Sequence, residues 1–185
     1  MRQTKPAPAR PRRLLHTICL SSLTLGLGPG LVTPAVGNTG HHLQIAGYVE
    51  RVRLMDTDLV LKARMDTGAT TSSLHAVNLK RFKKKGKEWV RFQLDDPDQE
   101  DGHLTLEYPV LRNVRIIRHD GDHQRRPIIK LSLCIGTHLR LEEVSLVNRS
   151  EFTYPLLVGR NHMSGAILVD PGKRYLLPPD CSNAS

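Results

Sequence analysis

Short runs in which apolar and polar residues alternate fill most of the chain beyond residue 43. Leu61, Ala63 and Met65 alternate with Lys62 and Arg64, which predicts a strand with one buried and one mixed face. Comparable strand patterns occupy residues 45–54, 88–94, 103–108, 110–117, 127–135 and 138–147. Many short strands separated by turn residues predict a mainly β domain that forms a closed or nearly closed barrel.

Interruptions in this pattern predict turns, one irregularity and little helix. A Gly-Thr pair at residues 136–137 joins the last two segments as a hairpin, and residues 118–126 predict a loop or hairpin tip. The alternation of the last segment shifts at residues 142–143, which predicts a β-bulge. Short helices are predicted only at residues 76–82 and after Gly159.

The beginning of the chain has the features of an export signal. Basic residues precede an apolar run at residues 14–27, and the small residues 34–37 follow it. The run would extend about 21 Å as a helix at ~1.5 Å per residue, short of a ~30 Å hydrocarbon core. We expect cleavage after Gly37 and a periplasmic location, with an uncleaved membrane anchor as the alternative. The expected organisation is a signal peptide at residues 1–37, a linker at 38–43, a β domain at 44–180 and a tail at 181–185.

The net charge of the chain does not point to a nucleic-acid partner. The chain has 27 Lys and Arg residues and 18 Asp and Glu residues, but five of the basic residues precede residue 38, so the remainder carries +4. The basic residues that remain concentrate at residues 80–87. Exported chains rarely meet nucleic acid, so we interpret this segment as a solvated hairpin connection and expect no nucleic-acid partner. Weak contact with an anionic surface is the alternative.

Two cysteines, Cys134 and Cys181, lie beyond the export signal. An oxidising compartment would allow a disulfide between them that tethers the C-terminal tail. Neither has the CxxC spacing typical of metal or redox sites. The sequence leaves a disulfide and two free thiols as equal alternatives.

The most specific chemical motif follows the strand at residues 61–65. Asp66, Thr67 and Gly68 place a carboxylate, a hydroxyl and a residue without a side chain on one tight loop. Aspartic peptidases use two neighbouring carboxylates that share a proton, one as base toward a bound water and the other as acid. An Asp-Thr-Gly triplet also suits an ordinary β-turn. Its place after a strand, and the Gly-Arg-Asn at residues 159–161, favour the catalytic interpretation.

Longer motifs connect these segments to a known family. They lie at residues 63–76, 89–92, 126–129, 157–161 and 168–173. Together they resemble the retroviral proteases (retropepsins) and, more closely, the bacterial retropepsin-like aspartic peptidases labelled ATP-dependent zinc protease. The resemblance extends from residue 46 to residue 177. It implies a retropepsin-like closed barrel in residues 44–180, aspartic endopeptidase activity, and a hairpin before Arg126 that acts as a flap.

The candidate site has one catalytic residue and a set of supporting residues. Asp66 is the catalytic group by this resemblance. The active-site loop and its support comprise Thr67, Gly68, Ala69, Thr70, His75, Gly159, Arg160 and Asn161. For His75 two interpretations stay open: a group that tunes the site, or a structural histidine held by hydrogen bonds, which we favour.

The family label names ATP and zinc, for which the residues offer little support. The chain has neither a phosphate-binding GxxxxGK[ST] motif nor the HExxH motif of zinc peptidases. His119, Asp120, Asp122 and His123 are ligand-type side chains, but four from one short segment predict an exposed polar loop tip rather than a metal site. We therefore expect no ATP and no metal cofactor.

Only Asp66 has the setting of a catalytic aspartate. The segments at residues 56–58 and 170–172 both have turn compositions. The resemblance implies a symmetric homodimer in which Asp66 of two chains forms the pair. One position departs from the viral pattern, because Thr70 occupies the place of an aspartate there. Arg160 must therefore find another partner, or the dimer is built differently.

These observations favour an exported aspartic endopeptidase that hydrolyses peptide or isopeptide bonds in a peptide or protein substrate. A non-catalytic peptide-binding module on the same fold is the main alternative, and a metal-dependent hydrolase built on the His119 segment is a weaker one. Members of the family are associated with peptide ligases, so a glutamate-rich substrate is consistent with the resemblance.

Overall fold

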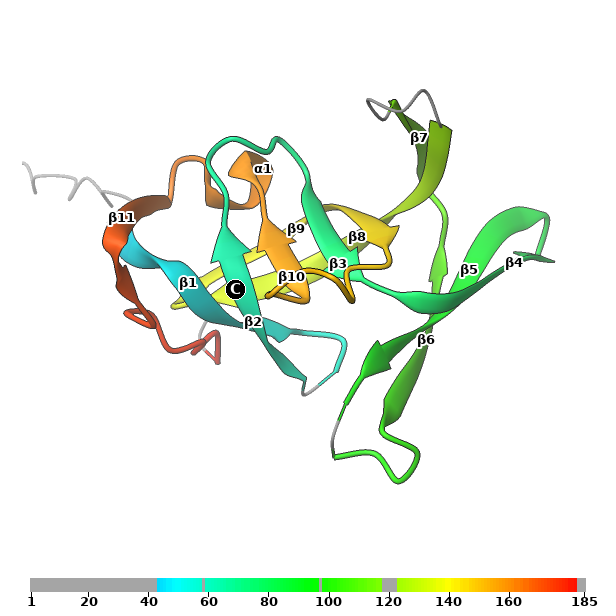
Figure 1. Cartoon of the computed structure of the whole chain (residues 1–185), viewed down its shortest axis with the longest axis horizontal. Helices are drawn as coiled ribbons and strands as arrows, with labels where there is room; N and C mark the ends of the chain where they lie inside the picture. The colour runs from blue at the N-terminus through cyan, green and yellow to red at the C-terminus, as the bar shows by residue number, and fades with distance from the viewer. Residues whose placement is uncertain (1–42, 58, 97, 118–122, 183–185) are drawn as a thin grey trace, which may run out of the picture. The chain divides into compact units, whose positions relative to one another are not determined.

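The structure is a computed structural model that describes residues 43–57, 59–96, 98–117 and 123–182. Figure 1 shows its elements, which are β1 (Gln44–Leu54), β2 (Val60–Met65), β3 (Ser72–His75), β4 (Val77–Lys84), β5 (Lys87–Asp95), β6 (His103–Pro109), β7 (Arg112–Ile117), β8 (His123–Ile135), β9 (His138–Val147), β10 (Leu156–Val158), α1 (Arg160–Met163) and β11 (Ile167–Arg174). Within these described ranges no helix is long and apolar enough to cross a membrane. The export signal predicted at residues 1–37 lies outside the described residues.

Six strands close into a ring in the order β1, β2, β10, β3, β9, β8. The closing contact between β1 and β8 is short and pairs Arg53 with Cys134 and Leu54 with Leu133. Outside the ring, β11 pairs with β1 and β7 pairs with β8 (Figure 1). The prediction of a mainly β chain with a closed or nearly closed barrel is confirmed.

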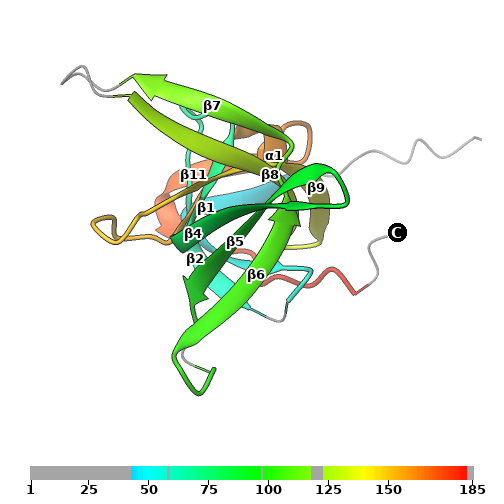
Figure 2. The same ribbon diagram turned by 90° about the vertical axis from the view of Figure 1, so that its right-hand side faces the viewer.

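The core follows from side-chain alternation along the strands. Leu61, Ala63 and Met65 of β2 point into the core, whereas the residues between them are exposed, as the sequence pattern predicts. Phe92 and Leu94 of β5 belong to the same core cluster. The separate sheet of β4, β5 and β6, whose three strands lie side by side in Figure 2, therefore packs on the barrel.

The helix predicted at residues 76–82 is wrong, because this segment forms β4. Asn78 has a φ of 52°, which an α-helix does not accommodate. The turn at Lys85 and Gly86, both with positive φ, folds β4 back onto β5 as a hairpin. Strand pairing thus outweighs the helical spacing, and the basic segment at residues 80–87 is a hairpin, as expected. The helix predicted after Gly159 is confirmed as α1.

The β-bulge predicted at residues 142–143 is also wrong. β8 and β9 pair without a register shift from Ile128–Ser145 to Ile135–His138. Leu141, which suggested the shift, is 55% exposed on the outer face of β9. Exposed leucines are common on protein surfaces. In the sequence pattern, Leu141 looked like a core residue and therefore suggested that the strand changed its buried face.

The hairpin that the resemblance implies as a flap is a two-stranded ribbon of β7 and the first part of β8. It runs from the pair Arg112–Ile128 to the pair Ile117–His123 and extends away from the ring strands in Figure 2. Residues 123–126 belong to strand β8, so the predicted loop is shorter than expected at this end. Its remaining residues 118–122 lie outside the described residues.

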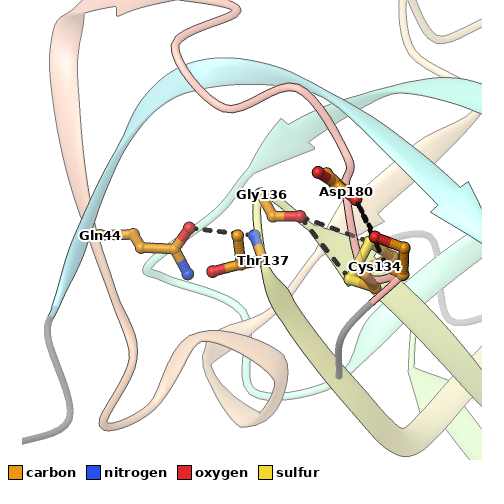
Figure 3. Close-up of a disulfide and its surroundings, with 7 residues drawn as sticks. Gln44, Cys134, Gly136, Thr137 and Asp180 are labelled. Atoms are coloured by element: carbon orange, nitrogen blue, oxygen red, sulfur yellow. Dashed lines mark hydrogen bonds between the residues drawn. A yellow bond between two sulfur atoms is a disulfide. The ribbon is translucent and has the colours of Figure 1, made fainter. Parts of the chain in front are cut away.

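Cys134 and Cys181 form a disulfide, with their Cα atoms 6.0 Å apart (Figure 3). The N–H of Asp180 also donates to the carbonyl of Gly136 at 2.8 Å, at the turn between β8 and β9. Of the two alternatives for these cysteines, the structure has the disulfide. It fastens the C-terminal tail to the hairpin of β8 and β9.

Candidate active site

Asp66 lies where β2 ends and a loop toward β3 begins. Strand β10 lies between these two strands, parallel to β2 and antiparallel to β3. The N–H of Asp66 donates to the carbonyl of Val158 at 2.9 Å, which continues the pairing of β2 and β10 by one residue. The barrel therefore fixes the backbone at Asp66, although the residues that follow it are on the surface.

The carboxylate of Asp66 is held by its own loop. Oδ1 accepts the N–H of Gly68 at 2.9 Å and the N–H of Ala69 at 3.2 Å. Oδ2 accepts no hydrogen bond from the described part of the chain. One oxygen is thus positioned and the other is free to act on water. Gly68 permits this arrangement, because a Cβ there would lie 3.1 Å from Oδ1.

Arg160 fastens this loop from α1. Its Nη1 donates to the carbonyls of Thr67 at 2.9 Å and Gly68 at 2.7 Å, and its Nη2 donates to the Thr70 hydroxyl at 2.8 Å. Hydrogen bonds from a charged donor are stronger than those between neutral groups. Arg160 therefore has partners within its own chain, which answers the question raised by the threonine at position 70.

The backbone at the start of α1 also forms hydrogen bonds with this loop. The N–H groups of Arg160 and Asn161 donate to the carbonyls of Ala69 at 2.9 Å and Thr70 at 3.1 Å. Gly159 allows this close approach, because a Cβ there would lie 2.8 Å from the Thr70 oxygen. The structure thus brings all but one of the predicted supporting residues together around Asp66.

A buried pair that the sequence did not single out lies beneath this contact. Ser72 Oγ accepts the N–H of Gly159 at 2.9 Å and lies 2.8 Å from Nδ1 of His162. The hydroxyl of Ser72 thus links the backbone at Gly159 to the ring of His162. Burial lowers the pKa of His162 to about 4, so this histidine is neutral at neutral pH. Its partner is 90 residues away in sequence, so no local pattern pointed to it.

His75 is the supporting residue that lies apart from Asp66. It is buried, its Nδ1 accepts the N–H of Arg149 at 2.9 Å, and its Nε2 lies 3.7 Å from the Asp95 carboxylate. Among the described residues, no hydrogen bond joins it to Asp66. This placement favours the structural interpretation of His75.

Arg149 is a second residue that sequence reasoning missed. It is 8% exposed, and its Nη1 donates to Ser73 Oγ at 2.8 Å. Burial lowers the pKa of Arg149, the positive charge of Arg126 lowers it further, and the negative charge of Asp66 opposes both. These interactions place a buried cation within electrostatic reach of Asp66.

Two of the other aspartates considered as partners already accept hydrogen bonds within the chain. Asp170 Oδ1 accepts the N–H of Gly172 at 2.8 Å, and Asp56 Oδ2 accepts the hydroxyl of Tyr108 at 2.7 Å. Asp58 lies outside the described residues, as do residues 119–122 of the candidate metal segment. Across the part of the chain that the structure describes, no three His, Cys, Asp or Glu side chains lie together as metal ligands would.

Comparisons with known proteins agree with this geometry. The family model for RimB-like proteins, described as retropepsin-like aspartic endopeptidase RimB, matches residues 45–180. Two curated relatives are named probable alpha-L-glutamate ligase. The protein from Shewanella halifaxensis (strain HAW-EB4) is 39% identical over 119 residues, which are 63% of this chain and 26% of that protein. The one from Parasynechococcus marenigrum (strain WH8102) is 37% identical over 113 residues, 60% of this chain and 24% of that protein. The chain thus spans about a quarter of the length of the curated relatives that it matches.

A solved structure shares the fold. The crystal structure of Lpg0085, a protein of unknown function from Legionella pneumophila subsp. pneumophila str. Philadelphia 1, is 36% identical with a TM-score of 0.61. The match covers 71% of this chain and 96% of that one. The barrel of this chain presents Asp66 on a loop that Gly159 and Arg160 hold in place. Because the family model matches most of the chain, the chain belongs to the RimB-like family of retropepsin-like aspartic endopeptidases.

Proposed function

We propose that this chain is an aspartic endopeptidase that hydrolyses peptide or isopeptide bonds, with Asp66 as half of a carboxylate pair completed by a second copy of the chain. The observation that carries this proposal is the state of the Asp66 carboxylate. One oxygen is held by the N–H groups of Gly68 and Ala69, and the other accepts no hydrogen bond from the described residues.

The reaction follows from the pairing of two such carboxylates. Like charges at close range resist ionising together, so the two Asp66 side chains share one proton. The ionised carboxylate takes a proton from a bound water, which attacks the substrate carbonyl carbon. The protonated carboxyl donates its proton to the carbonyl oxygen. Collapse of the tetrahedral intermediate breaks the C–N bond, and a proton from the pair passes to the leaving nitrogen.

Two features support the homodimer. Arg160 completes the active-site loop within one chain, so each copy brings a preformed loop to the interface. At the outer edge of the sheet, Ile45 and Leu168 are direct neighbours, and they are 56% and 54% exposed. An adjacent pair of exposed apolar residues is a suitable contact for a two-fold interface.

The names of the curated relatives support a substrate class. Proteins named for alpha-L-glutamate ligation carry, in about a quarter of their length, a region similar to this chain. A hydrolase region beside a ligase is well placed to act on the product of ligation. We therefore propose glutamate-containing peptides as substrates.

The disulfide supports export as part of this proposal. Disulfides persist in oxidising compartments such as the bacterial periplasm and are rare in the cytosol. Cys134 and Cys181 form such a bond, which fits the export signal expected before residue 38. Retention by an uncleaved signal is the alternative location, and the N-terminal sequence of the protein recovered from its host distinguishes the two.

The test is cleavage of α-linked glutamate peptides and of an unstructured protein by the purified protein, with and without EDTA. We expect cleavage in both conditions and a loss of about three orders of magnitude or more in Asp66→Asn, as expected when one member of a catalytic unit is removed. Asp170→Asn is the matched control, because its carboxylate also accepts an N–H two residues on but lies in strand β11, which pairs with β1.

Each other outcome supports a rival. Full activity in Asp66→Asn would contradict the proposal. Loss of wild-type activity in EDTA would support a metal-dependent hydrolase, and peptide binding without any cleavage would support a peptide-binding module.

A further inference from the structure

The hairpin of β4 and β5 concentrates basic charge that the proposed peptidase reaction does not use. Six of the eight residues at positions 80–87 are lysine or arginine, and all six are exposed. Strand β4 is an edge strand of the β4–β5–β6 sheet, and Figure 1 shows the turn between β4 and β5 pointing away from the ring strands. The hairpin therefore presents its charge to the surroundings of the molecule.

Cross-strand pairing arranges these side chains in rows. The three successive pairs on one face are Lys80–Arg91, Phe82–Trp89 and Lys84–Lys87. Val90 and Phe92, which alternate with residues of these rows along β5, belong to the core cluster. Because neighbouring residues of a strand point to opposite faces, the three rows face away from the core. An aromatic pair thus lies between two pairs of cations on an outer face, with the two ring centres 6.5 Å apart.

The cation rows are unfavourable within the chain alone. Like charges directly opposite each other on paired strands repel. Glu107 of β6 offsets part of this repulsion, since its carboxylate lies 2.5 Å from Arg91 Nη2 and 3.3 Å from Lys84 Nζ. Among the described residues, no ion pair includes Lys80 or Lys87. One cation of each row therefore lacks a counterion, and an anionic partner would remove the remaining repulsion.

The aromatic row indicates which anionic partner fits. Lys84 Nζ lies 4.5 Å from the centre of the Trp89 ring, and the Arg91 guanidinium lies 5.6 Å from the centre of the Phe82 ring. A nucleic-acid base that stacks on an aromatic side chain needs an open ring face, whereas here a cation covers a face of each ring. Tryptophan beside lysine is typical of the boundary between membrane and water, where the ring lies at headgroup level and the ammonium group reaches phosphate. This combination favours a lipid surface.

We propose that the β4–β5 hairpin is a membrane-contact surface that binds anionic phospholipids through its two cation rows, with Trp89 at the level of the headgroups. The proposal goes beyond the peptidase function and does not depend on Asp66. The basic residues at positions 80–87 and Arg91 outnumber Glu88 and Glu107, which leaves a net charge of +5. Each lysine or arginine near an anionic bilayer strengthens binding by about fivefold. The contact is reversible and weakens as salt screens the charges.

The first test measures co-sedimentation of the whole purified protein with vesicles of phosphatidylglycerol or of phosphatidylcholine, at low and at high salt. We expect binding to phosphatidylglycerol to be at least about tenfold tighter, and high salt to remove most of this difference. Lys80→Gln combined with Lys87→Gln removes the unpaired cation of each row. This double variant should bind phosphatidylglycerol roughly twenty-five-fold more weakly.

Lys62→Gln combined with Lys173→Gln is the matched control. It removes the same charge from exposed positions on β2 and β11. Charges more than a Debye length from the lipid surface are screened, so this control should bind within about twofold of the wild-type protein. Residues 1–37 are unchanged in both double variants, so a contribution of that segment cancels. Thermal unfolding verifies that both variants are folded.

Tryptophan fluorescence tests the orientation. Trp89 is the only tryptophan of the chain, so its emission reports the hairpin and no other segment. Its side chain is partly exposed. Phosphatidylglycerol vesicles should shift the emission to shorter wavelength and reduce quenching by acrylamide, because the indole leaves water. Phosphatidylcholine vesicles should cause neither change.

Equal binding to the two lipids, equal losses in the two double variants, or unchanged Trp89 emission in protein bound to phosphatidylglycerol would overturn the proposal. Binding of a single-stranded oligonucleotide that alters Trp89 emission, without binding to vesicles, would overturn it in favour of a nucleic-acid surface. Asp66→Asn should bind vesicles as the wild-type protein does. Vesicle binding and peptide cleavage therefore test the two proposals separately.

Discussion

Gly159→Ala tests how closely α1 must approach the active-site loop. The φ of Gly159 is −88°, which alanine adopts without strain, so the substitution acts only through contact. The new Cβ would lie 2.8 Å from both the oxygen of Thr70 and the carbonyl carbon of Thr71. Ordinary contacts begin near 3.4 Å, so the two backbones must separate by about 0.6 Å. Overpacking of this kind costs about 1–3 kcal/mol of folding free energy.

The substitution should lower activity as well as stability. Thr70 and Thr71 belong to the loop that holds Asp66, so the loop must move when α1 is displaced. A misplacement of about 1 Å in a catalytic group can cost about a hundredfold in rate. We expect kcat/KM to fall by roughly ten- to a hundredfold. The assays are urea unfolding and cleavage of a glutamate peptide.

Gly172→Ala provides the control. Its nearest contact would be a side-chain oxygen of Asp170 at 3.3 Å, which can rotate away. This variant should resemble the wild-type protein in both assays. Gly159→Ala within twofold of wild-type activity, at unchanged stability, would refute the claim that this contact positions Asp66.

Three further predictions concern the loop, the buried histidine and the disulfide. Gly68→Ala should lower kcat/KM by about tenfold and change the free energy of unfolding by less than about 1 kcal/mol. The new Cβ would lie 3.1 Å from Asp66 Oδ1, so it would rotate this carboxylate without disturbing the packing of the barrel. An unchanged kcat/KM would contradict this prediction. His162 has a pKa lowered to about 4, so the unfolded chain binds more protons between that pH and 6.5, and stability should fall by roughly 3 kcal/mol as the pH drops through this window. Urea unfolding of His162→Gln should show a flatter pH dependence there, and an identical slope would contradict the assignment. Reduction of the Cys134–Cys181 disulfide, which encloses 47 residues, should cost about 4 kcal/mol by loop entropy, and an unchanged unfolding midpoint under reductant would contradict that value.

The parts of the site that sequence could predict are those with local chemistry. Asp66, Gly68 and Gly159 were identifiable because a carboxylate on a glycine loop and a glycine before an arginine are short patterns with a physical reason. The partners of Arg160 were not, because carbonyl groups carry no sequence signal and the contact joins segments about 90 residues apart. Arg149 had no motif at all, since its burial and its hydrogen bond to Ser73 arise only in the folded chain.

The errors in the fold have the same origin. Residues 76–82 have a helical spacing, but pairing with β5 and the positive φ of Asn78 make them a strand. Leu141 looked like a core residue, yet it lies on the outer face of a regular strand. Local patterns therefore predicted the strands and the barrel, whereas tertiary pairing decided the exceptions.

The central claim is that two copies of Asp66 form one catalytic centre, and a mixing experiment tests it most directly. Wild-type protein and Asp66→Asn are combined in varying proportions at constant total concentration, allowed to exchange subunits, and assayed for peptide cleavage. A shared pair leaves only wild-type homodimers active, so an equal mixture should retain about a quarter of the wild-type activity. A linear dependence, with about half of the activity at an equal mixture, would contradict the shared pair and place a complete catalytic centre in each chain.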